Sequence, residues 1–393
     1  MQNCEHELMS IRGAAFIAGI YEHPGRDLPD HTIWDIHAES AIGALADAGL
    51  SMSDVDGLFC DGTAGFGVLT LCDHLGLRPQ YVDSTETGGS SYLAHVGHAA
   101  AAIAAGKCSV ALVTLAGKPR TGSPVVKWAP GPESGFEGVW GTASAAHSYA
   151  LAAQRHMYEF GTTSAQLAEI KVAASIHAQY NPHAFLQNVV TVDEVLESPM
   201  VSDPLHRLDC CVVTDGGGAL VVVSPEVAKK LGKTNAKVLG HGEAVKHTSN
   251  GRIDLTYTGA VMSGPRAFEE ARVSVADVDY ASIYDSFTIT VLQTIEDLGF
   301  CEKGKGGEFV MDGGLVAPFG KLPFNTDGGG LCNNHPSNRG GITKVIEAVR
   351  QLRGEAHPAV QVPDVQIALA HGTGGSLGSR HGSVTLLLGQ EDA

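Results

Sequence analysis

The 393-residue sequence predicts an α/β protein made of two copies of one strand and helix unit. Apolar strand patterns alternate with helical patterns along most of the chain, which is typical of mixed sheets flanked by helices. Glycine is abundant at 49 residues and aromatic residues make up only 6%, as expected where many tight turns join apolar strands to helices of small residues. The third observation is an internal repeat.

The repeat consists of two pairs of matching segments. Ser, Asp, Val and Asp recur at the same spacing in 51–56 and in 274–279. A helix that runs into a strand recurs after each of them, first as 92–105 with 109–115 and later as 342–353 with 365–370. Two matched pairs in one order indicate a duplication, with halves at 1–230 and 231–393. We expect the active site where the two halves meet.

The remaining elements follow in chain order. A short apolar strand at 13–20 precedes a helix at 34–49, whose apolar positions have helical spacing and which ends at Gly49. Between the copies, 116–208 contains two of the three tryptophans, polar loops and a predicted helix at 164–180, and we interpret it as an inserted loop region that covers the site. The first copy then closes with a strand behind a bend of three glycines, 216–218.

Composition excludes several classes of function. The formal charge is −17 with 26 lysines and arginines and no basic run, which argues against nucleic acid or an anionic membrane as the main partner. The eight cysteines include no Cys-x-x-Cys pair, so a zinc ribbon within this chain is not expected, and their scatter fits reduced thiols. No apolar run approaches the roughly 18 residues of a membrane span, and the first twelve residues lack a signal-peptide core. We expect a cytoplasmic protein.

A glycine-rich segment at 325–341 is the strongest local signal. Three glycines precede the pair His335-Pro336, and a chain this rich in glycine is expected to pass close to a ligand or catalytic centre. Pro336 and the residues after it fit a turn that opens the helix at 342–353. A histidine at this position could act as a base or an acid, whereas the alternative is a surface histidine in a turn.

Several motifs together resemble the thiolase superfamily, and in particular its sterol-carrier-protein-X type and the thiolase-like lipid-transfer relatives. They are 161–168 with 180–184, Cys210 to Ala219, Tyr284 to Phe287, Gly328 to Pro336 and Ala370 to Gly375. The order and spacing of these motifs cover essentially the whole chain. The resemblance implies two βαβαβαββ halves in a five-layer αβαβα sandwich, usually in a dimer.

The sequence departs from that family at both of its thiols. The stretch 83–92, which corresponds to the family's nucleophile, contains no cysteine, places Glu86 at the nucleophile position and has Ser90 and Ser91 just beyond. The family motif His-Asp-Cys-Phe reads Tyr284-Asp285-Ser286-Phe287. A serine would need its own general base, and a carboxylate is a poor acyl carrier from a thioester. Cys332, beside the His-Pro pair, is the one thiol left open.

The surviving chemistry is that of a thioester enolate. A retro-aldol cleavage of a β-hydroxyacyl-CoA passes through this enolate without an acyl-enzyme, and the resemblance to thiolase-like aldolases of steroid side chains points the same way. We predict four catalytic residues, each with a structural alternative: His335 as acid/base, Tyr284 as donor or tyrosinate, His371 at the thioester oxygen and Glu86 as acid/base or helix-start carboxylate. The predicted substrate-binding set is Ser90, Ser91, Tyr257, Asp285 (as an orienting carboxylate), Cys332, Gly374 and Gly375.

The sequence therefore predicts a carbon–carbon lyase for a bulky β-hydroxyacyl-CoA, such as a steroid side-chain thioester, with no cofactor or metal beyond the CoA of the substrate. Two alternatives stay open: a thiolase-type acyltransferase that uses Cys332, and a non-catalytic acyl-CoA-binding scaffold subunit. The resemblance further implies a homodimer and a small zinc-ribbon and OB-fold partner, which would have to be a separate chain because no Cys-x-x-Cys is present.

Overall fold

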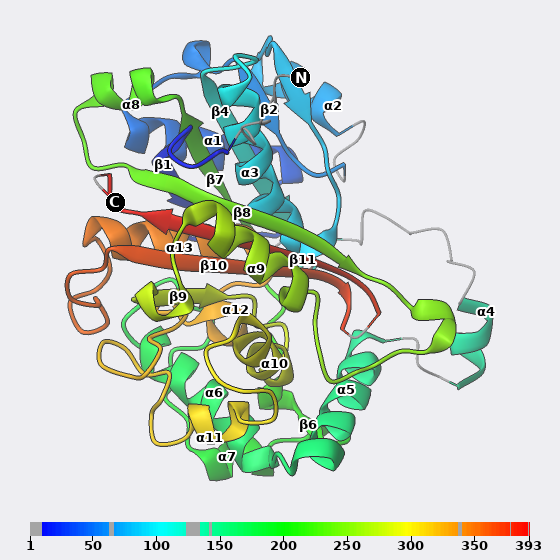
Figure 1. Ribbon diagram of the computed structural model, residues 1–393. Coiled ribbons are helices and arrows are strands. Elements are labelled where there is room, and N and C mark those ends of the chain that lie inside the picture. Colours follow the sequence, from blue (N-terminus) through cyan, green and yellow to red (C-terminus); the bar gives the residue numbers. More distant parts are fainter. Residues whose placement is uncertain are drawn as a thin grey trace, which may run out of the picture.

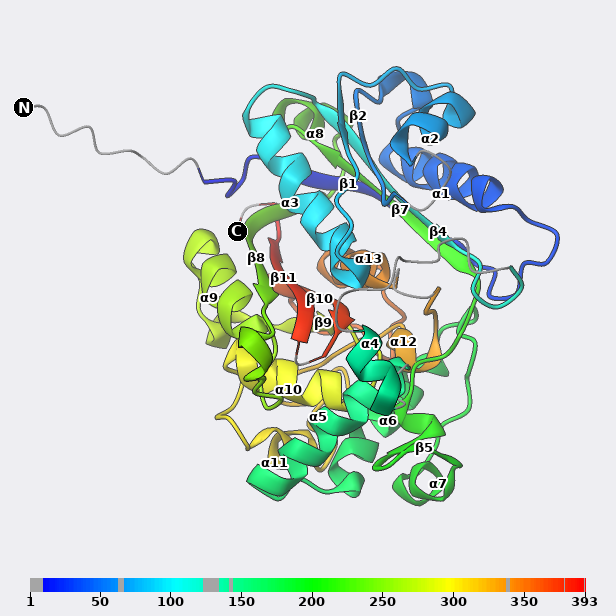
Figure 2. The same ribbon diagram turned by 90° about the vertical axis from the view of Figure 1, so that its right-hand side faces the viewer.

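Helices and strands alternate in five layers, which are seen in profile in Figure 2. In the first half, α1 (Ile33–Ala48) covers one face of β1, β4 and β7. The middle layer holds α3 (Ser91–Ala104) and α13 (Gly341–Arg353), and each of them contacts strands of both halves. The outer layer of the second half holds α9 (Ala260–Ala271) and α10 (Thr288–Leu298). The predicted αβαβα sandwich is confirmed.

The computed structural model describes residues 10–62, 67–122, 134–140, 144–336, 340–377, 379–391 and 393 (Figure 1). The strands are β1 (Phe16–Glu22), β2 (Gly57–Phe59), β3 (Tyr81–Asp83), β4 (Val110–Gly117), β5 (Met200–Ser202), β6 (Leu205–His206), β7 (Gly216–Val223), β8 (Ala236–Lys246), β9 (Tyr280–Ile283), β10 (Ile367–Ser376) and β11 (Ser379–Gly389). The other α-helices are α2 (Val68–Leu75), α4 (Ser134–Glu137), α5 (Ala145–Phe160), α6 (Ser164–Ala178), α7 (Val192–Glu197), α8 (Pro225–Leu231), α11 (Gly306–Val310) and α12 (Gly329–Cys332).

The strands of the two halves are joined into one sheet. Its order is β3-β2-β4-β7-β1-β8-β11-β10-β9, and the junction is a short antiparallel pairing of Phe16 with Lys237 and Ile17 with Ala236. The sequence predicts a mixed sheet for each half, and each is mixed: β2 is parallel to β4 and β9 to β10, whereas β7 and β11 are antiparallel to their neighbours. The continuity across β1 and β8 was not predicted.

The duplicated segments have the same structure and the same structural role. Each begins with a capped 3-10 turn, Met52–Asp54 or Val275–Asp277, and leads into a strand. The carboxylate of Asp56 accepts hydrogen bonds from the backbone N–H groups of Ser109 and Val110. Asp279 likewise accepts from Gln366 and Ile367, at 2.8 and 2.9 Å. In both halves this aspartate fixes the start of the next parallel strand.

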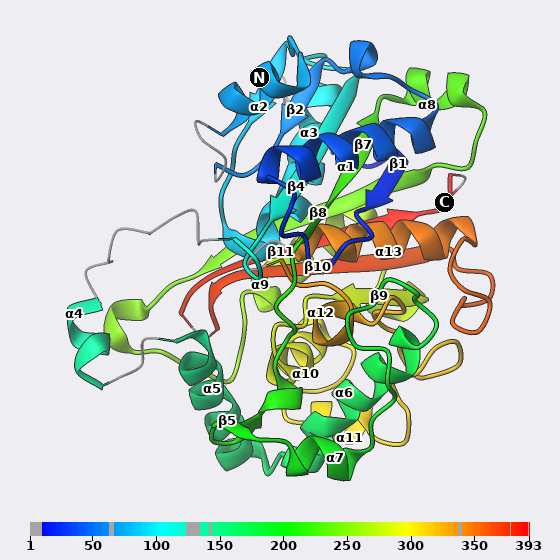
Figure 3. The ribbon, with the colours of Figure 1, turned by 180° about the vertical axis from the view of Figure 1, so that it is seen from behind.

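The central core lies between the middle helices and both parts of the sheet. Leu93 and Val96 of α3 pack in one cluster with Val345 of α13 and Leu386 of β11, and all four are fully buried. Truncating one such leucine to alanine typically costs about 2–5 kcal/mol, so this layer supplies a large share of the stability. Figure 3 shows α13 running along the sheet below α1.

The region 116–208 packs on the outer side of the second half, where α5 and α6 lie against α10, α11 and α12 (Figure 1). The predicted helix at 164–180 is confirmed as α6, which starts with a capping box between Thr163 and Gln166. Residues 123–133 and 141–143, with Trp128, lie outside the described residues. The bend predicted at 216–218 is wrong, because these glycines open β7. Within the described residues, no helix is long and apolar enough to cross a membrane.

Candidate active site

Tyr284 and His335 meet where the two halves join. Tyr284 directly follows β9, and His335 lies three residues after α12. The phenol Oη and the imidazole Nε2 are 2.9 Å apart, and the two rings meet edge to face. Both side chains are buried, with exposed fractions of 4% for Tyr284 and 8% for His335. The structure thus brings together two of the four predicted catalytic residues in a direct hydrogen bond.

The first half contributes the loop that faces this pair. A Cβ atom added to Gly89 would lie 2.4 Å from the Tyr284 ring, and one added to Gly341 would lie 1.7 Å from the carbonyl oxygen of Gly89. A Cβ atom on Gly374 would lie 1.7 Å from the carbonyl oxygen of Thr87. Only glycine fits at such backbone contacts. The glycines near the site therefore let 87–89, β10 and the start of α13 press together around Tyr284.

Polar groups outside the pair hold both residues in place. The backbone N–H of His335 donates to Thr214 Oγ1 at 2.9 Å, and the N–H of Tyr284 donates to the carbonyl oxygen of His371 at 2.9 Å. Asp285, the next residue, accepts from the N–H groups of Gly330 and Leu331 and from Lys344 Nζ. Neither Thr214 nor Lys344 was predicted as part of the site.

The imidazole of His335 is electrically neutral at ordinary pH. Burial lowers the pKa of His335 to about 4, with the Asp285 carboxylate acting to raise it and the Lys344 ammonium to lower it. A neutral imidazole has one nitrogen that donates and one that accepts. A neutral His335 can therefore accept a proton, directly or from Tyr284, without first losing one of its own.

The comparisons with known proteins identify the family of this chain. A family model described as "Thiolase C-terminal domain-like" matches residues 242–389. The chain is 32% identical over 375 residues to an acetyl-CoA acetyltransferase of Methanothermobacter thermautotrophicus, covering 92% of this chain and 97% of that relative. This chain belongs to the thiolase superfamily.

Two further proteins are similar to this chain over most of its length. A steroid side-chain-cleaving aldolase of Thermomonospora curvata is 32% identical over 365 residues, which cover 88% of this chain and 91% of the relative. A solved structure named "Ltp2-ChsH2(DUF35) aldolase" superposes with a TM-score of 0.87 at 31% identity, covering 97% of this chain and 99% of that one.

In the segment 83–92, which the resemblance predicts to correspond to the superfamily's nucleophile, the side chains make hydrogen bonds at the start of α3. Ser90 Oγ donates to the carbonyl oxygen of Thr87 at 2.9 Å, and Ser91 Oγ accepts from the Thr87 N–H at 2.8 Å. In the part of the chain that the structure describes, neither hydroxyl makes a hydrogen bond to a histidine. Glu86 Oε1 accepts from the N–H of Gly88 at 2.9 Å, which places this half-buried carboxylate at the first turn before α3.

Cys332 ends α12 and is buried completely. Lys171 Nζ lies 3.1 Å from its Sγ and also donates to the carbonyl oxygen of Leu331. Burial raises the pKa of the Cys332 thiol, although the ammonium of Lys171 opposes this effect. A reactive cysteine is normally accessible and has a lowered pKa, so Cys332 has the features of a structural thiol.

His371 is separated from the Tyr284 and His335 pair by the sheet. It lies within β10, not after a strand as predicted, and side chains along a strand alternate between faces. Gly372 faces Ser90 and Leu93 of the middle layer, so His371 points to the outer layer, where its Nδ1 is 3.0 Å from Thr385 Oγ1. The prediction that His371 reaches the thioester oxygen is therefore contradicted by the geometry.

The remaining predicted residues fall in two places. Gly374 and Gly375 pair with Gly382 and His381 of β11 and border the loop at 87–88. Tyr257 is half-buried in the loop before α9, and its ring covers Lys246 Nζ at 3.7 Å from the ring centroid. Lys246 also donates to the carbonyl oxygen of Tyr257 at 2.6 Å. Tyr257 thus belongs to the wall around Lys246 and makes no hydrogen bond to the pair.

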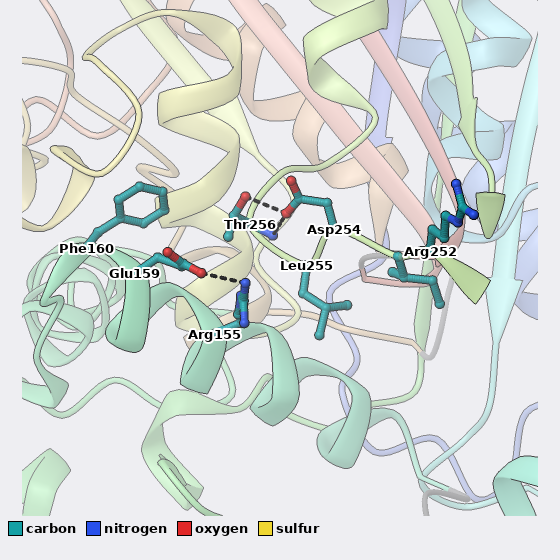
Figure 4. A pocket seen from close by; sticks show the side chains of 8 residues that line it. Arg155, Glu159, Phe160, Arg252, Asp254, Leu255 and Thr256 are labelled. Carbon is teal, nitrogen blue, oxygen red and sulfur yellow. Dashed lines mark hydrogen bonds and ion pairs between the residues drawn. The ribbon is translucent and has the colours of Figure 1, made fainter. Parts of the chain in front are cut away.

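A pocket of about 670 Å³ lies next to that wall (Figure 4). It is formed by α5 on one side and the loop before Tyr257 on the other, and it is lined by Arg155, Glu159, Phe160, Arg252, Ile253, Asp254, Leu255 and Thr256. The loop is held to α10, because Gln293 Nε2 donates a hydrogen bond to the carbonyl oxygen of Leu255 at 2.8 Å. Nearer the site, α5 and α10 meet where Tyr149 packs on Phe287 at 4.3 Å between ring centroids.

One cluster in the described residues has a composition that could hold a metal ion: His23, His31 and Glu39. Its geometry is unfavourable for that role. The N–H of Gly25 donates to His23 Nδ1 at 3.1 Å, so the proton of a neutral His23 sits on Nε2, which contacts Glu39 at 2.8 Å. A metal on Nε2 would require the other tautomer. The contacts of His23 thus favour a hydrogen-bonded histidine over a metal ligand.

Proposed function

We propose that this chain is a carbon–carbon lyase that cleaves a bulky β-hydroxyacyl-CoA by a retro-aldol reaction. The observation that carries the proposal is the buried hydrogen bond between Tyr284 and a neutral His335, in a chain whose segment 83–92 has no cysteine. The similarity to a steroid side-chain-cleaving aldolase supports it. So does 32% identity over 365 residues to a 17-hydroxy-3-oxo-4-pregnene-20-carboxyl-CoA lyase of Mycobacterium tuberculosis. We infer a steroid side chain or a similarly branched group as the acyl part.

The proposed reaction begins at the substrate hydroxyl. The Tyr284 and His335 pair accepts the proton of the β-hydroxyl, the Cα–Cβ bond breaks, and a ketone or aldehyde leaves. The bond electrons remain on Cα as the enolate of the CoA thioester. The same pair then returns the proton to Cα, so that the products are a carbonyl compound and a shortened acyl-CoA, with no oxidant or reductant. Because Tyr284 and His335 are hydrogen-bonded to each other, a proton taken up by one of them can be shared with the other.

The enolate oxygen needs donors while the negative charge is present. We assign this role to backbone N–H groups near Gly374 and Gly375, where β10 borders the loop at 87–88. Donors that are already oriented in a site without water stabilise a developing oxyanion by about 3–4 kcal/mol each. CoA enters as part of the substrate, and the proposed chemistry requires no further cofactor.

A thiolase-type acyl transfer is the second candidate, because acetyl-CoA acetyltransferases are among the relatives that this chain matches over most of its length. That reaction needs a thiolate as acyl carrier. Cys332, three residues before His335, is the thiol that the sequence leaves open, and it is fully buried against Lys171. Its burial favours the lyase over the acyltransferase.

The test compares the two reactions directly. Purified protein is incubated with branched β-hydroxyacyl-CoA thioesters, and the products are followed by mass spectrometry. The lyase yields a ketone or aldehyde with the shortened acyl-CoA, and Tyr284→Phe and His335→Ala should each lower kcat by about 10²- to 10⁴-fold. Thiolysis of a β-ketoacyl-CoA by free CoA, with an acyl group bound to the protein, would instead establish the acyltransferase. Binding without turnover and an undisturbed assembly in both variants would indicate a scaffold.

We also propose that the enzyme works as a homodimer together with a second, smaller protein of the zinc-ribbon and OB-fold kind. The name of the similar aldolase structure includes a DUF35 component, ChsH2, and a further relative is named as a thiolase subunit, BbsB of Thauera aromatica. Both names support a second chain. Purification from the native source followed by native mass spectrometry tests this. Recovery of one chain type alone, with full activity, would contradict it.

A further inference from the structure

Asp285 and Lys344 form a buried ion pair directly behind the candidate site. Lys344 Nζ lies 3.0 Å from Asp285 Oδ1, and the exposed fractions of the two side chains are 2% and 0%. Asp285 comes from the chain just after β9, and Lys344 from the first turn of α13. A buried charge without its partner is strongly unfavourable, so the two residues hold each other in place.

The carboxylate of Asp285 also holds the segment that carries His335. Oδ1 accepts from the Gly330 N–H at 2.8 Å and Oδ2 accepts from the Leu331 N–H at 3.0 Å. These groups belong to α12, whose chain continues to His335. A Cβ atom added to Gly330 would lie 3.1 Å from both Asp285 Oδ1 and His335 Cδ2. Asp285 is thus bonded to α12 and covalently linked to Tyr284, so that one carboxylate connects both members of the pair.

We propose that Asp285 and Lys344 are positioning residues, which fix the distance between Tyr284 and His335 and present a balanced charge to the imidazole. This inference rests on the proposed lyase reaction for its effect on turnover. An error of about 1 Å in the placement of reacting groups can reduce a rate by about 100-fold. The ion pair therefore acts on kcat through geometry, and neither residue needs to contact the substrate.

The charges near His335 determine how the Asp285 and Lys344 ion pair affects the pKa of its imidazole. His335 faces Asp285 and Lys344 as charged neighbours, with Tyr284 as its hydrogen-bond partner. Lys344 is also near the carboxylates of Asp327 and Glu22. Removing Lys344 leaves the imidazole facing the Asp285 carboxylate without its cation, whereas removing the charge of Asp285 leaves it facing the Lys344 ammonium without the carboxylate bonded to it. The two changes should move the pKa of His335 in opposite directions.

The experiment uses Asp285→Asn, Lys344→Met and the double variant that combines them. The pKa of His335 is followed by NMR of protein labelled in its histidines, which needs no substrate, and kcat and KM are measured with the cleaved β-hydroxyacyl-CoA. We expect a higher pKa in Lys344→Met and a lower pKa in Asp285→Asn, and a decrease in kcat of roughly 10- to 100-fold in both, with KM within about twofold. Glu296→Gln, which breaks the equally buried pair with His156, serves as the control and should leave the pKa of His335 unchanged.

The double variant separates positioning from stability. With both charges gone, the melting temperature should recover toward that of the wild type, while kcat stays low because the N–H groups of Gly330 and Leu331 in α12 no longer share one carboxylate. Recovery of kcat together with the melting temperature would overturn the inference, as would shifts of the His335 pKa in the same direction in both single variants. Opposite shifts of this pKa in a protein that cleaves none of the thioesters would refute the proposed lyase and leave the electrostatic part of the inference standing.

Discussion

The dependence of the free energy of unfolding on pH below 7 provides a quantitative test of the burial of His177. This ring is fully buried, and its Nε2 accepts a hydrogen bond from the N–H of Ala317 at 2.8 Å. Burial lowers the pKa of His177 from 6.5 to about 4, so between these values the unfolded chain binds a proton that the folded chain does not. Stability must therefore fall as the pH drops through about 6.5.

The size of this effect follows from the two pKa values. Proton binding by His177 in the unfolded chain favours unfolding by about 2 kcal/mol at pH 5 and by only about 0.2 kcal/mol at pH 7. Replacement by glutamine keeps an acceptor for Ala317 but removes the titration. The free energy of unfolding of His177→Gln should then decrease between pH 7 and pH 5 by about 2 kcal/mol less than that of the wild type.

Urea unfolding at the two pH values, followed by fluorescence, measures this difference. The exposed His183→Gln is the matched control and should keep the wild-type dependence on pH. A constant loss of stability at both pH values would reflect packing alone. If His177→Gln lost as much stability as the wild type between pH 7 and pH 5, the assignment of a neutral buried histidine would be wrong.

Three further predictions concern the site and the sheet. In the lyase, the acid limb of kcat/KM should lie near pH 4, where His335 is protonated, and a limb near pH 6.5 would contradict its burial. Cys332→Ser should retain activity within about twofold, and iodoacetamide should leave residue 332 unmodified in peptide maps of the native protein, because its thiol is inaccessible. His98 bonds Asp83 and Glu243, and its pKa is raised to about 9 by these hydrogen bonds, so its stabilising contribution is present below pH 6.5 and lost as the pH rises through about 9. Asp83→Asn should therefore flatten the decrease in melting temperature between pH 6.5 and pH 9, and an unchanged decrease would argue against the pair.

Much of the fold could be predicted because it is encoded by short-range patterns. The repeated Ser, Asp, Val and Asp of 51–56 and 274–279 identifies both halves, and the structure gives Asp56 and Asp279 the same hydrogen bonds. The helices at 34–49 and 164–180 were predictable from periodicity and caps. These features depend on neighbours within a few residues, which a single sequence displays.

The site was predictable only in part because its contacts are distant in the chain. Tyr284 and His335 stand out by motif, yet their hydrogen bond spans 51 positions and cannot be derived from spacing. His371 was expected just after a strand that ends at 370, but β10 continues to Ser376, so that the strand fixes the face on which His371 lies. Lys344 was missed because a lysine inside an apolar helix looks like an exposed residue until Asp285 is placed beside it.

The middle layer has a consequence for how the chain is made. The apolar face of α3 packs against α13, β10 and β11, which follow it in the second half of the chain. During synthesis this face lacks these partners, so the N-terminal half cannot complete its core until the second half has been made. We expect nascent chains that stop before α13 to be sensitive to protease and to bind chaperones, and the protein to gain its protection in a single step once β11 has left the ribosome.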